Sequence, residues 1–245
     1  SPAAVPLHLP RWRVVDIDTP EDWHRAELLF ELVERSQDME ATENGTASTT
    51  EQEPVRKYRC LPFSEIEEGD FRLRAVCERD MLKIMEWRNS QMDILRQSTP
   101  LNVSGQIKYF REYVETEYDK KNPEQILFSI IYKEYFVAYG GFVNIDWKSK
   151  RAELSFVCDK NIAKDIKQYQ FIFTKFIKLI KEISFNNLEM HRIFTETYDV
   201  RPHHVAVLES SGFAYEGCMK DHVKINGRFV NSLLHGCVRG ISGEC

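Results

Sequence analysis

The sequence predicts an α/β (α+β) fold with a mixed, mostly antiparallel central sheet and helices on both of its faces. Three observations lead to this expectation. Strand and helix patterns alternate along the main part of the chain, three strand patterns follow one another between helices, and a β-α-β-α-β run comes after them. Helices that connect strands bury their apolar stripes on a sheet, so a layered, mixed sheet accounts for this order.

The first elements expected in this order are a strand and two helices. Apolar and charged residues alternate over 71–75, which is typical of a strand with one buried face. Residues 80–87 and 104–118 carry apolar residues at helical spacing, with Met81 and Met85 on one side of the first helix.

Three strands are expected next, and a tight turn joins two of them. Apolar residues dominate 126–132 and 135–144, and the polar pair Lys133-Glu134 separates them as a hairpin turn. Residues 151–158 form the third strand pattern.

The remaining elements alternate helix and strand and close with a second hairpin. Residues 171–185 are strongly amphipathic at helical spacing, and a proline at the first position starts the short helix 202–210. Asn226-Gly227 is the preferred two-residue hairpin turn. The strands expected in this part are 192–197, 213–223 and 228–238.

Residues 1–57 differ in composition from the rest and are expected to form two segments. A helix N-cap and an apolar stripe within residues 1–35 predict a short helix, which is too small to bury a core of its own. Residues 36–57 are rich in Ser, Thr and Glu and lack aromatics, as a flexible acidic linker does. The main domain is expected to span 58–245, with its core at about 70–238.

Composition argues against several classes of protein and site. The 245 residues carry a net charge of −5, with Lys and Arg interspersed among Asp and Glu, which is unlike a nucleic-acid binder. No secretory signal and no apolar run of roughly 20 residues is recognised, so no membrane partner is expected. The 6 cysteines form no CxxC pair or zinc spacing, so we expect no metal site, reduced thiols and a cytoplasmic protein.

Four short motifs follow one another in a specific order. They are WRN at Trp87–Asn89, ELSF at Glu153–Phe156, HRIFTET at His191–Thr197 and VLESSGFAYEG at Val207–Gly217. Each motif is weak alone, but together their order and spacing resemble the GNAT superfamily of acetyltransferases. The resemblance implies a GNAT-like fold, acetyl-CoA as co-substrate, and enzymatic transfer of the acetyl group to an amine.

Within that superfamily, the sequence most resembles acetyltransferases of bacterial nonulosonic acid biosynthesis. These acetylate a UDP-4-amino-4,6-dideoxy sugar on the way to pseudaminic acid. In addition, DIDTPEDWHRAE at Asp16–Glu27 is similar to the C-terminal end of CMP-nonulosonate cytidylyltransferases, so residues 1–35 are expected to be the remnant or tail of such a domain. The expected partner is a nucleotide-linked amino sugar, with a polyamine or a protein N-terminus as alternatives.

The resemblance places acetyl-CoA along the strand expected at 151–158. Its pyrophosphate would lie on backbone amides at the start of the following helix, because helix N-termini favour anions. The family motif Gln/Arg-x-x-Gly-x-Gly/Ala falls on 168–173, where the first Gln is kept but aromatic residues replace the glycines. The cofactor contacts implied are Phe156, Val157 and Cys158 on the strand, and Lys167, Gln168, Tyr169 and Gln170 at the helix.

The missing glycines leave two interpretations open, because glycine normally allows a close approach of backbone to phosphate. A longer loop over 159–168 can bind the phosphates, with Lys160, Lys164 or Lys167 supplying charge. Alternatively, cofactor binding is lost, and the chain is a catalytically silent module that binds a partner or regulates an attached cytidylyltransferase.

Transfer to an amine requires a base that removes a proton from the acceptor. The candidates are titratable side chains on three elements: Glu153, His203, His204 and Tyr215. Glu153 can equally be an exposed strand residue, and the two histidines can be ordinary capping or surface residues. The family's general-acid tyrosine position is Leu208 here, so Tyr198 or Tyr215 would substitute, or the thiolate leaves without a side-chain acid.

The acceptor pocket implied by the resemblance contains Trp87, Arg88 and Asn89. Arg88 could hold a sugar-nucleotide phosphate bidentately. The alternative places Trp87 in the core and pairs Arg88 with a helix carboxylate. His222 on the closing hairpin is expected to reach the acceptor, with Asn231 beside it, and the assembly considered is a homodimer.

Overall fold

The computed structural model describes residues 56–240. The helix expected within residues 1–35 and all but the end of the expected linker lie outside the described residues. Among the helices of the described part, none combines the length and apolarity that crossing a bilayer requires.

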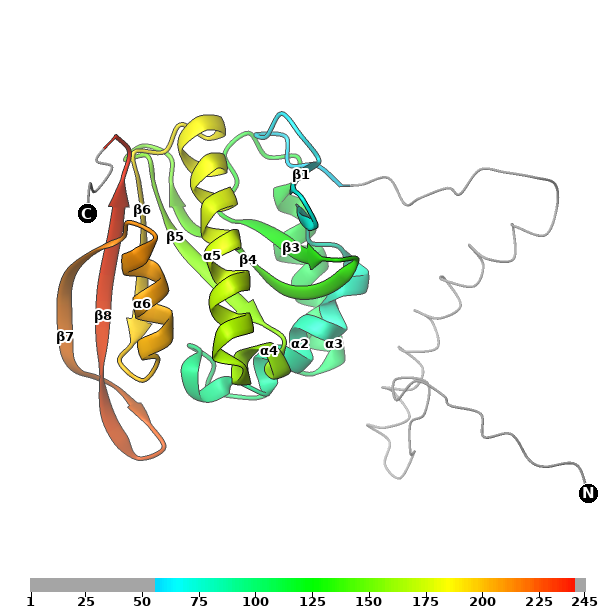
Figure 1. Cartoon of the computed structure of the whole chain (residues 1–245). Coiled ribbons are helices and arrows are strands. Elements are labelled where there is room, and N and C mark those ends of the chain that lie inside the picture. The colour runs from blue at the N-terminus through cyan, green and yellow to red at the C-terminus, as the bar shows by residue number, and fades with distance from the viewer. Residues whose placement is uncertain (1–55, 241–245) are drawn as a thin grey trace, which may run out of the picture. The chain divides into compact units, whose positions relative to one another are not determined.

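A single mixed sheet organises the described residues, as the sequence predicted (Figure 1). Its spatial order is β1-β2-β3-β4-β5-β6-β8-β7. Only β5 and β6 run parallel, and every other neighbouring pair is antiparallel. The strands are β1 (Glu65–Glu68), β2 (Phe71–Ala75), β3 (Ile126–Tyr132), β4 (Tyr135–Asp146), β5 (Arg151–Cys158), β6 (Arg192–Tyr198), β7 (Ala214–Ile225) and β8 (Arg228–Val238).

Helices lie on both faces of the sheet, with α5 and α6 on one face and α2 and α3 on the other (Figure 1). They are α2 (Met81–Asn89), α3 (Val103–Tyr109), α4 (Lys160–Lys164), α5 (Ile166–Glu182) and α6 (Pro202–Ser210). The helix predicted at 104–118 is α-helical only to Tyr109 and continues as a π-helical turn, Phe110–Val114, and a 3-10 turn, Glu115–Glu117. The wider π turn keeps both Phe110 and Val114 in the core.

Both predicted hairpin turns are present, and their backbone explains the residues found there. Lys133 and Glu134 both have positive φ, 47° and 64°, and so do Asn226 and Gly227, 48° and 82°. Two consecutive positive φ values match the right-handed twist of the strands that such a turn joins.

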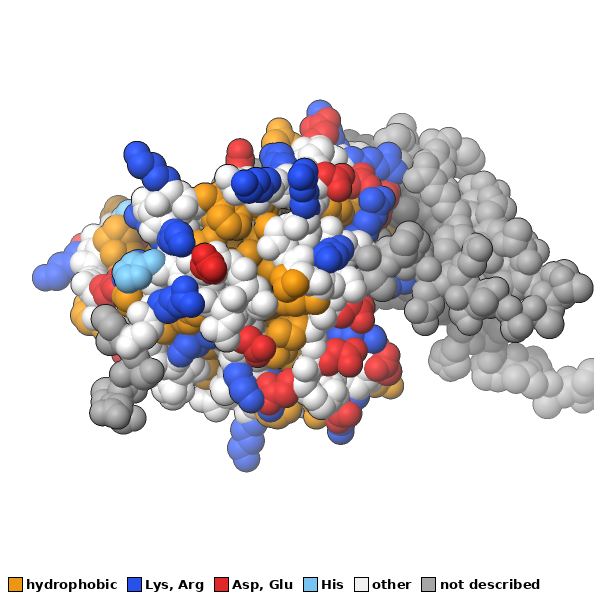
Figure 2. Space-filling view, turned by 90° about the horizontal axis from the view of Figure 1, so that it is seen from above, with side chains coloured by type: hydrophobic (Ala, Val, Ile, Leu, Met, Phe, Trp, Pro, Cys, Tyr) orange, Lys and Arg blue, Asp and Glu red, His pale blue; other side chains and the backbone are white. Residues whose placement is uncertain are grey.

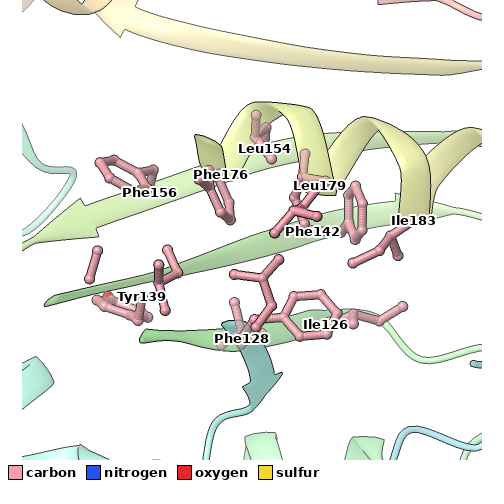
Figure 3. Packing of buried hydrophobic residues seen from close by; sticks show 14 of the residues in the cluster. Ile126, Phe128, Tyr139, Phe142, Leu154, Phe156, Phe176, Leu179 and Ile183 are labelled. Atoms are coloured by element: carbon pink, nitrogen blue, oxygen red, sulfur yellow. The ribbon is translucent and has the colours of Figure 1, made fainter. Parts of the chain in front are cut away.

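The apolar stripe of α5 packs on the centre of the sheet. Figure 3 shows Phe176 and Leu179 of α5 pointing towards the strands beside Leu154 of β5 and Phe142 of β4. All four side chains are buried. Burial of this stripe fixes α5 along β5, which brings the start of the helix to the end of the strand.

On the face shown in Figure 2, charged side chains of both signs are mixed among the described residues. On the described part of the face seen from above, Lys and Arg alternate with Asp and Glu, with apolar areas between them (Figure 2). This distribution agrees with the mixed charge pattern of the sequence.

The feature that positions the site is a divergence between the two parallel strands. The β5–β6 ladder begins at Arg151↔Arg192 and stops after Glu153↔Phe194. Beyond this point β5 stays paired to β4 as far as Cys158, and β6 stays paired to β8 as far as Tyr198. The strands therefore separate, and each leaves an edge without ladder partners facing the gap.

Candidate active site between the diverging strands

A cavity of about 170 Å³ occupies the gap between β5 and β6. Its walls come mainly from both strands, with further residues from β4, from the end of α2 and the loop after it, from α5, and from the start of α6. Because consecutive strand residues point to opposite faces, β5 and β6 present side chains on both sides of the gap. The cavity is therefore open to groups from both helical layers.

The edge of β5 that faces this cavity supplies backbone donors and acceptors. The Asp159 N–H donates to the Val137 carbonyl, 2.9 Å away on the β4 side. Since the direction of backbone groups alternates along a strand, Phe156 and Leu154 direct their N–H and C=O groups into the gap. The Cys158 carbonyl also faces away from β4, but it already accepts from the Gln91 side-chain amide at 2.8 Å.

One side of the cavity holds a carboxylate pair bridged by an arginine. Arg96, from the loop after α2, donates through Nη2 to Glu153 Oε1 and to Glu196 Oε2, both at 2.8 Å. Glu153 also accepts from Asn144 Nδ2 at 2.8 Å, and its side chain is only 11% exposed. Phe194 is the ladder partner of Glu153, so these two side chains lie on the same face of the sheet. Glu196, two residues later on β6, lies on that face as well.

The predicted residue His222 lies at the edge of this carboxylate pair. Its Nε2 is 3.7 Å from Glu196 Oε1. Tyr198 also lines the cavity on this side, and burial raises the pKa of its hydroxyl above the ordinary value. The tyrosine therefore keeps its proton at neutral pH.

The α5–α6 side of the cavity is built from different chemistry. His204, in the first turn of α6, lines the cavity, is buried, and stacks on Phe173 with ring centroids 4.3 Å apart. Its Nδ1 lies 2.6 Å from the hydroxyl of Tyr169, and that hydroxyl also accepts a hydrogen bond from Arg201. Since Arg201 can only donate, the hydroxyl proton is available to His204 Nδ1, which assigns the tautomer protonated at Nε2.

His204 is neutral in this environment. Burial, reinforced by the positive charge of Arg201, lowers its pKa well below the ordinary value. The His203 pKa is lowered as well, first by partial burial and then by Arg201. His203 lies edge-on against the Tyr169 ring, with centroids 4.8 Å apart, and does not line the cavity.

The segment expected to bind pyrophosphate is helical. Residues Lys160–Lys164 form α4 and α5 begins at Ile166, five residues before the predicted start at 171, so the motif position 168–173 lies inside the helix. That prediction of the helix start was wrong, because it did not recognise Asp165 as the N-cap. Asp165 accepts from the Lys167 and Gln168 N–H groups at 3.0 and 3.1 Å.

The predicted cofactor contacts on α5 consequently have distinct positions. Gln168 is exposed and its side-chain amide donates to Asp165 at 3.1 Å, while Tyr169 is fully buried. Lys167 is exposed and Gln170 half-buried. On β5, Phe156 and Val157 line the cavity, whereas the Cys158 side chain is buried.

The residues of the WRN motif separate into a core residue, a cavity residue and a loop anchor. Trp87 is 1% exposed and its indole N–H donates to Asp159 at 3.0 Å, so it lies in the core, one of the two alternatives considered. Arg88 lines the cavity and donates to the Tyr139 hydroxyl at 2.8 Å. Asn89 binds the backbone of Leu101 through both its amide oxygen and nitrogen, each at 2.8 Å.

Arg88 does not pair with a helix carboxylate, which was the second alternative considered from sequence. Its other hydrogen bond goes to the Gln97 amide oxygen at 3.0 Å, so both of its partners are neutral. Tyr215, on β7, is 54% exposed and packs against His235 away from the cavity.

Three charged cavity residues were missed from sequence. Glu196 could have been found, because it follows Phe194 by two positions on a strand expected beside the one that contains Glu153. Arg96 and Arg201 lie in connections between elements, where no periodicity shows the direction of a side chain.

Metal-ligating side chains form no second centre among the described residues. Across residues 56–240, no cluster of three or more His, Cys, Asp or Glu side chains is arranged to hold a metal ion. The cysteines described there are free thiols.

Comparison with known proteins gives one family and one recurring fold. The acetyltransferase (GNAT) domain family matches residues 73–234. The structure is similar to a dodecameric spermidine N-acetyltransferase from Vibrio cholerae, with a TM-score of 0.59 and 17% identity over 70% of this chain and 95% of that chain. The same enzyme in complex with CoA and spermine gives a TM-score of 0.59 and 16% identity over 70% and 96% of the two chains. Among curated proteins, none matches this sequence.

Proposed function

Because the chain belongs to the acetyltransferase (GNAT) family, and is therefore an acetyl-CoA-dependent acyltransferase, we propose that it acetylates a small primary amine bound beside Glu153 and Glu196. The observation that carries this proposal is the divergence of β5 from β6. It leaves a free backbone edge and a carboxylate pair on the walls of a single cavity.

The free edge of β5 fits the acyl donor. Acetyl-CoA supplies an activated thioester, and a pantetheine chain can pair with the Leu154 carbonyl and the Phe156 backbone groups, which lie beyond the end of the β5–β6 ladder. The Phe156 N–H is the donor suited to the acetyl carbonyl oxygen, where negative charge develops as the amine attacks. A fixed donor in a partly dry cavity stabilises such charge without reorganisation.

The carboxylate pair fits the acceptor. An amine must lose a proton before its nitrogen can form the new N–C bond, and Glu153 is the proposed acceptor of that proton because it lines the cavity and is nearly buried. As the C–S bond breaks, the departing sulfur requires a proton. Tyr198 is the proposed donor, since it lines the same cavity and its hydroxyl carries a proton at neutral pH.

The charge of this region favours an acceptor that is itself a cation. Two carboxylates and one arginine leave one net negative charge around Arg96. Arg96 is half-exposed, so an ammonium group could replace it between the carboxylates. A polyamine is the first acceptor we propose, and the similar Vibrio cholerae structures are those of spermidine N-acetyltransferases.

A nucleotide-linked amino sugar is the second proposed acceptor. Arg88 lines the cavity and has neutral hydrogen-bond partners, so its charge is available to a phosphate. The sequence resemblance to nonulosonic acid enzymes motivates the same candidate.

The test is a titration followed by a turnover assay. Calorimetry should detect acetyl-CoA binding, and CoA release should then be measured with spermidine and with a UDP-4-amino-4,6-dideoxy sugar. Turnover of spermidine that falls strongly in Glu196→Gln supports the first acceptor. Turnover of the sugar nucleotide that falls in Arg88→Met supports the second. Failure to bind acetyl-CoA at millimolar concentration would overturn the proposed function.

A further inference from the structure

The start of α5 is poorly suited to bind a phosphate. Helix N-termini attract anions because their first N–H groups are unpaired. Here the Asp165 carboxylate accepts from two of them, Lys167 N–H and Gln168 N–H, and also holds the Gln168 side chain. A phosphate at this point would find both N–H donors occupied, and the negative charge of Asp165 would repel it.

A different cation lies at the same end of the cavity. Arg201 precedes α6 and lines the cavity. Its guanidinium lies 5.4 Å from the centre of the ring of Tyr169, a residue in the first turns of α5. Within residues 56–240 no carboxylate pairs with Arg201, and its hydrogen bond goes to the neutral Tyr169 hydroxyl. A guanidinium carries five N–H donors, so most of them remain available for a ligand.

Buried neighbours hold this guanidinium in place. Tyr169 is fully buried and its hydroxyl connects Arg201 to His204 Nδ1. His204 is fixed in turn by its stacking on Phe173. An arginine positioned by neutral groups keeps its full charge for an anion and loses little side-chain entropy when the anion binds.

The position of Arg201 fits one part of the donor. Glu153 and Glu196 mark the end of the cavity where the strands part, and the proposed acceptor site lies there. A donor aligned on β5 with its acetyl group at that end extends towards Cys158 and the start of α5. Its phosphate groups would then lie near Arg201.

We propose that Arg201, positioned by Tyr169 and His204, binds the phosphates of acetyl-CoA in place of the N-terminal amides of α5. This inference rests on the proposed function. The ligand class is a diphosphate ester, for which the planar fork of arginine provides two parallel hydrogen bonds.

The experiment compares two donors that differ in their phosphates. Calorimetry measures the Kd of acetyl-CoA and of acetyl-pantetheine, which has no phosphate, for the wild type and for Arg201→Met. We expect the acetyl-CoA Kd to rise about 10-fold to 100-fold, as the loss of charge-assisted hydrogen bonds predicts, and the acetyl-pantetheine Kd to stay unchanged. Arg201→Lys, which keeps the charge but not the fork, should lie between them.

Matched variants separate phosphate binding from general charge and from misfolding. Arg151→Met removes the same charge from the opposite end of β5, at a residue paired with Asp146, and should leave both Kd values unchanged. Circular dichroism and thermal unfolding show whether each variant is folded. A rise in Kd that is equal for both donors would reveal a structural effect and overturn the inference.

Two further outcomes distinguish this inference from the function it rests on. If the wild type binds acetyl-CoA and Arg201→Met binds it equally well, the inference fails and the proposed function stands. A larger effect from Lys167→Met than from Arg201→Met would also overturn it, because the phosphates would then lie on α5. If the wild type binds no acetyl-CoA, both proposals fail together.

Discussion

Arg96 and Arg201 line the same cavity, but the protein treats their charges in opposite ways. Arg96 is bridged to two carboxylates at 2.8 Å each, so its charge is more than neutralised within the chain. Arg201 donates to a neutral tyrosine hydroxyl and has no carboxylate partner among the described residues. The comparison teaches that partners, rather than residue type, decide what an arginine offers to a ligand.

This difference gives the cavity a direction. Around Arg96 the surplus charge is negative and suits a cation, whereas around Arg201 it is positive and suits an anion. A transferase that joins an anionic donor to an amine benefits from such separation, because each substrate is repelled from the other's end. Variants at the two ends should therefore affect different substrates.

The largest expected effect comes from removing the negative end. Glu153→Gln should lower kcat/KM about 100-fold, because the proposed proton acceptor is lost, while the Kd of acetyl-CoA stays unchanged. Steady-state kinetics and calorimetry measure the two quantities. Glu189→Gln, at an exposed carboxylate paired with Lys150, is the control and should change neither. If Glu153→Gln weakened acetyl-CoA binding by as much as it lowered kcat/KM, the donor and acceptor ends of the cavity would not be separate.

The next effect concerns the neutral histidine that supports the positive end. The folded pKa of His204 is lowered by burial, so below about pH 6.5 the unfolded chain binds a proton that the folded chain does not. Its contribution to stability is present above that pH and is lost as the pH falls towards the folded pKa. Through His204 alone, the free energy of unfolding should therefore drop by about 1.4 kcal/mol from about pH 7.5 to about pH 5.5.

Denaturant unfolding of the wild type and of His204→Asn at both pH values isolates this term. The variant loses the titrating group, so its drop in stability should be smaller by the same amount, even if it is less stable throughout. Identical pH dependence in the two proteins would mean that His204 titrates normally, contrary to its burial.

A smaller effect is expected where the support of Arg201 is weakened but its charge is kept. Tyr169→Phe removes the hydroxyl that accepts from Arg201 and leaves the ring beneath the guanidinium. We expect the Kd of acetyl-CoA to rise about 5-fold, within the range for one hydrogen bond, and the KM of the amine to stay constant. Tyr113→Phe, at an exposed tyrosine, is the control. A change in the KM of the amine without a change in the Kd of acetyl-CoA would place Tyr169 at the acceptor end of the cavity and contradict this prediction.

The sequence predicted the sheet well because its signals are local. The turn Asn226-Gly227 and the alternation along 71–75 depend on backbone preference and burial within a few residues. The site was harder, since Tyr169 and His204 are 35 residues apart and meet only when α5 and α6 pack together. No local sequence pattern indicates this contact.

The misplaced start of the long helix has a physical cause. Apolar periodicity placed the start of the long helix at 171, but a helix begins where its first N–H groups find an acceptor. Asp165 provides one, and the helix extends back to Ile166. The glycine-motif position 168–173 therefore lies inside the helix, after its capping residue.

The smallest expected effect tests whether that cap also opposes the donor. Asp165→Asn keeps an oxygen that accepts from Lys167 and Gln168 N–H groups, so α5 should retain its start and its stability within about 0.5 kcal/mol. The variant removes one negative charge from the positive end of the cavity. The Kd of acetyl-CoA should fall about 2-fold, the size expected for one exposed charge, and the effect should shrink at high salt. Acetyl-pantetheine, which has no phosphates, should bind equally to both proteins. The double variant Asp165→Asn/Arg201→Met gives the opposing test. If Asp165→Asn tightened acetyl-CoA binding 10-fold or more in the Arg201→Met protein, the phosphates would lie at the helix N-terminus. Arg201 would then not be the phosphate ligand, and the proposed contrast between Arg96 and Arg201 would be wrong.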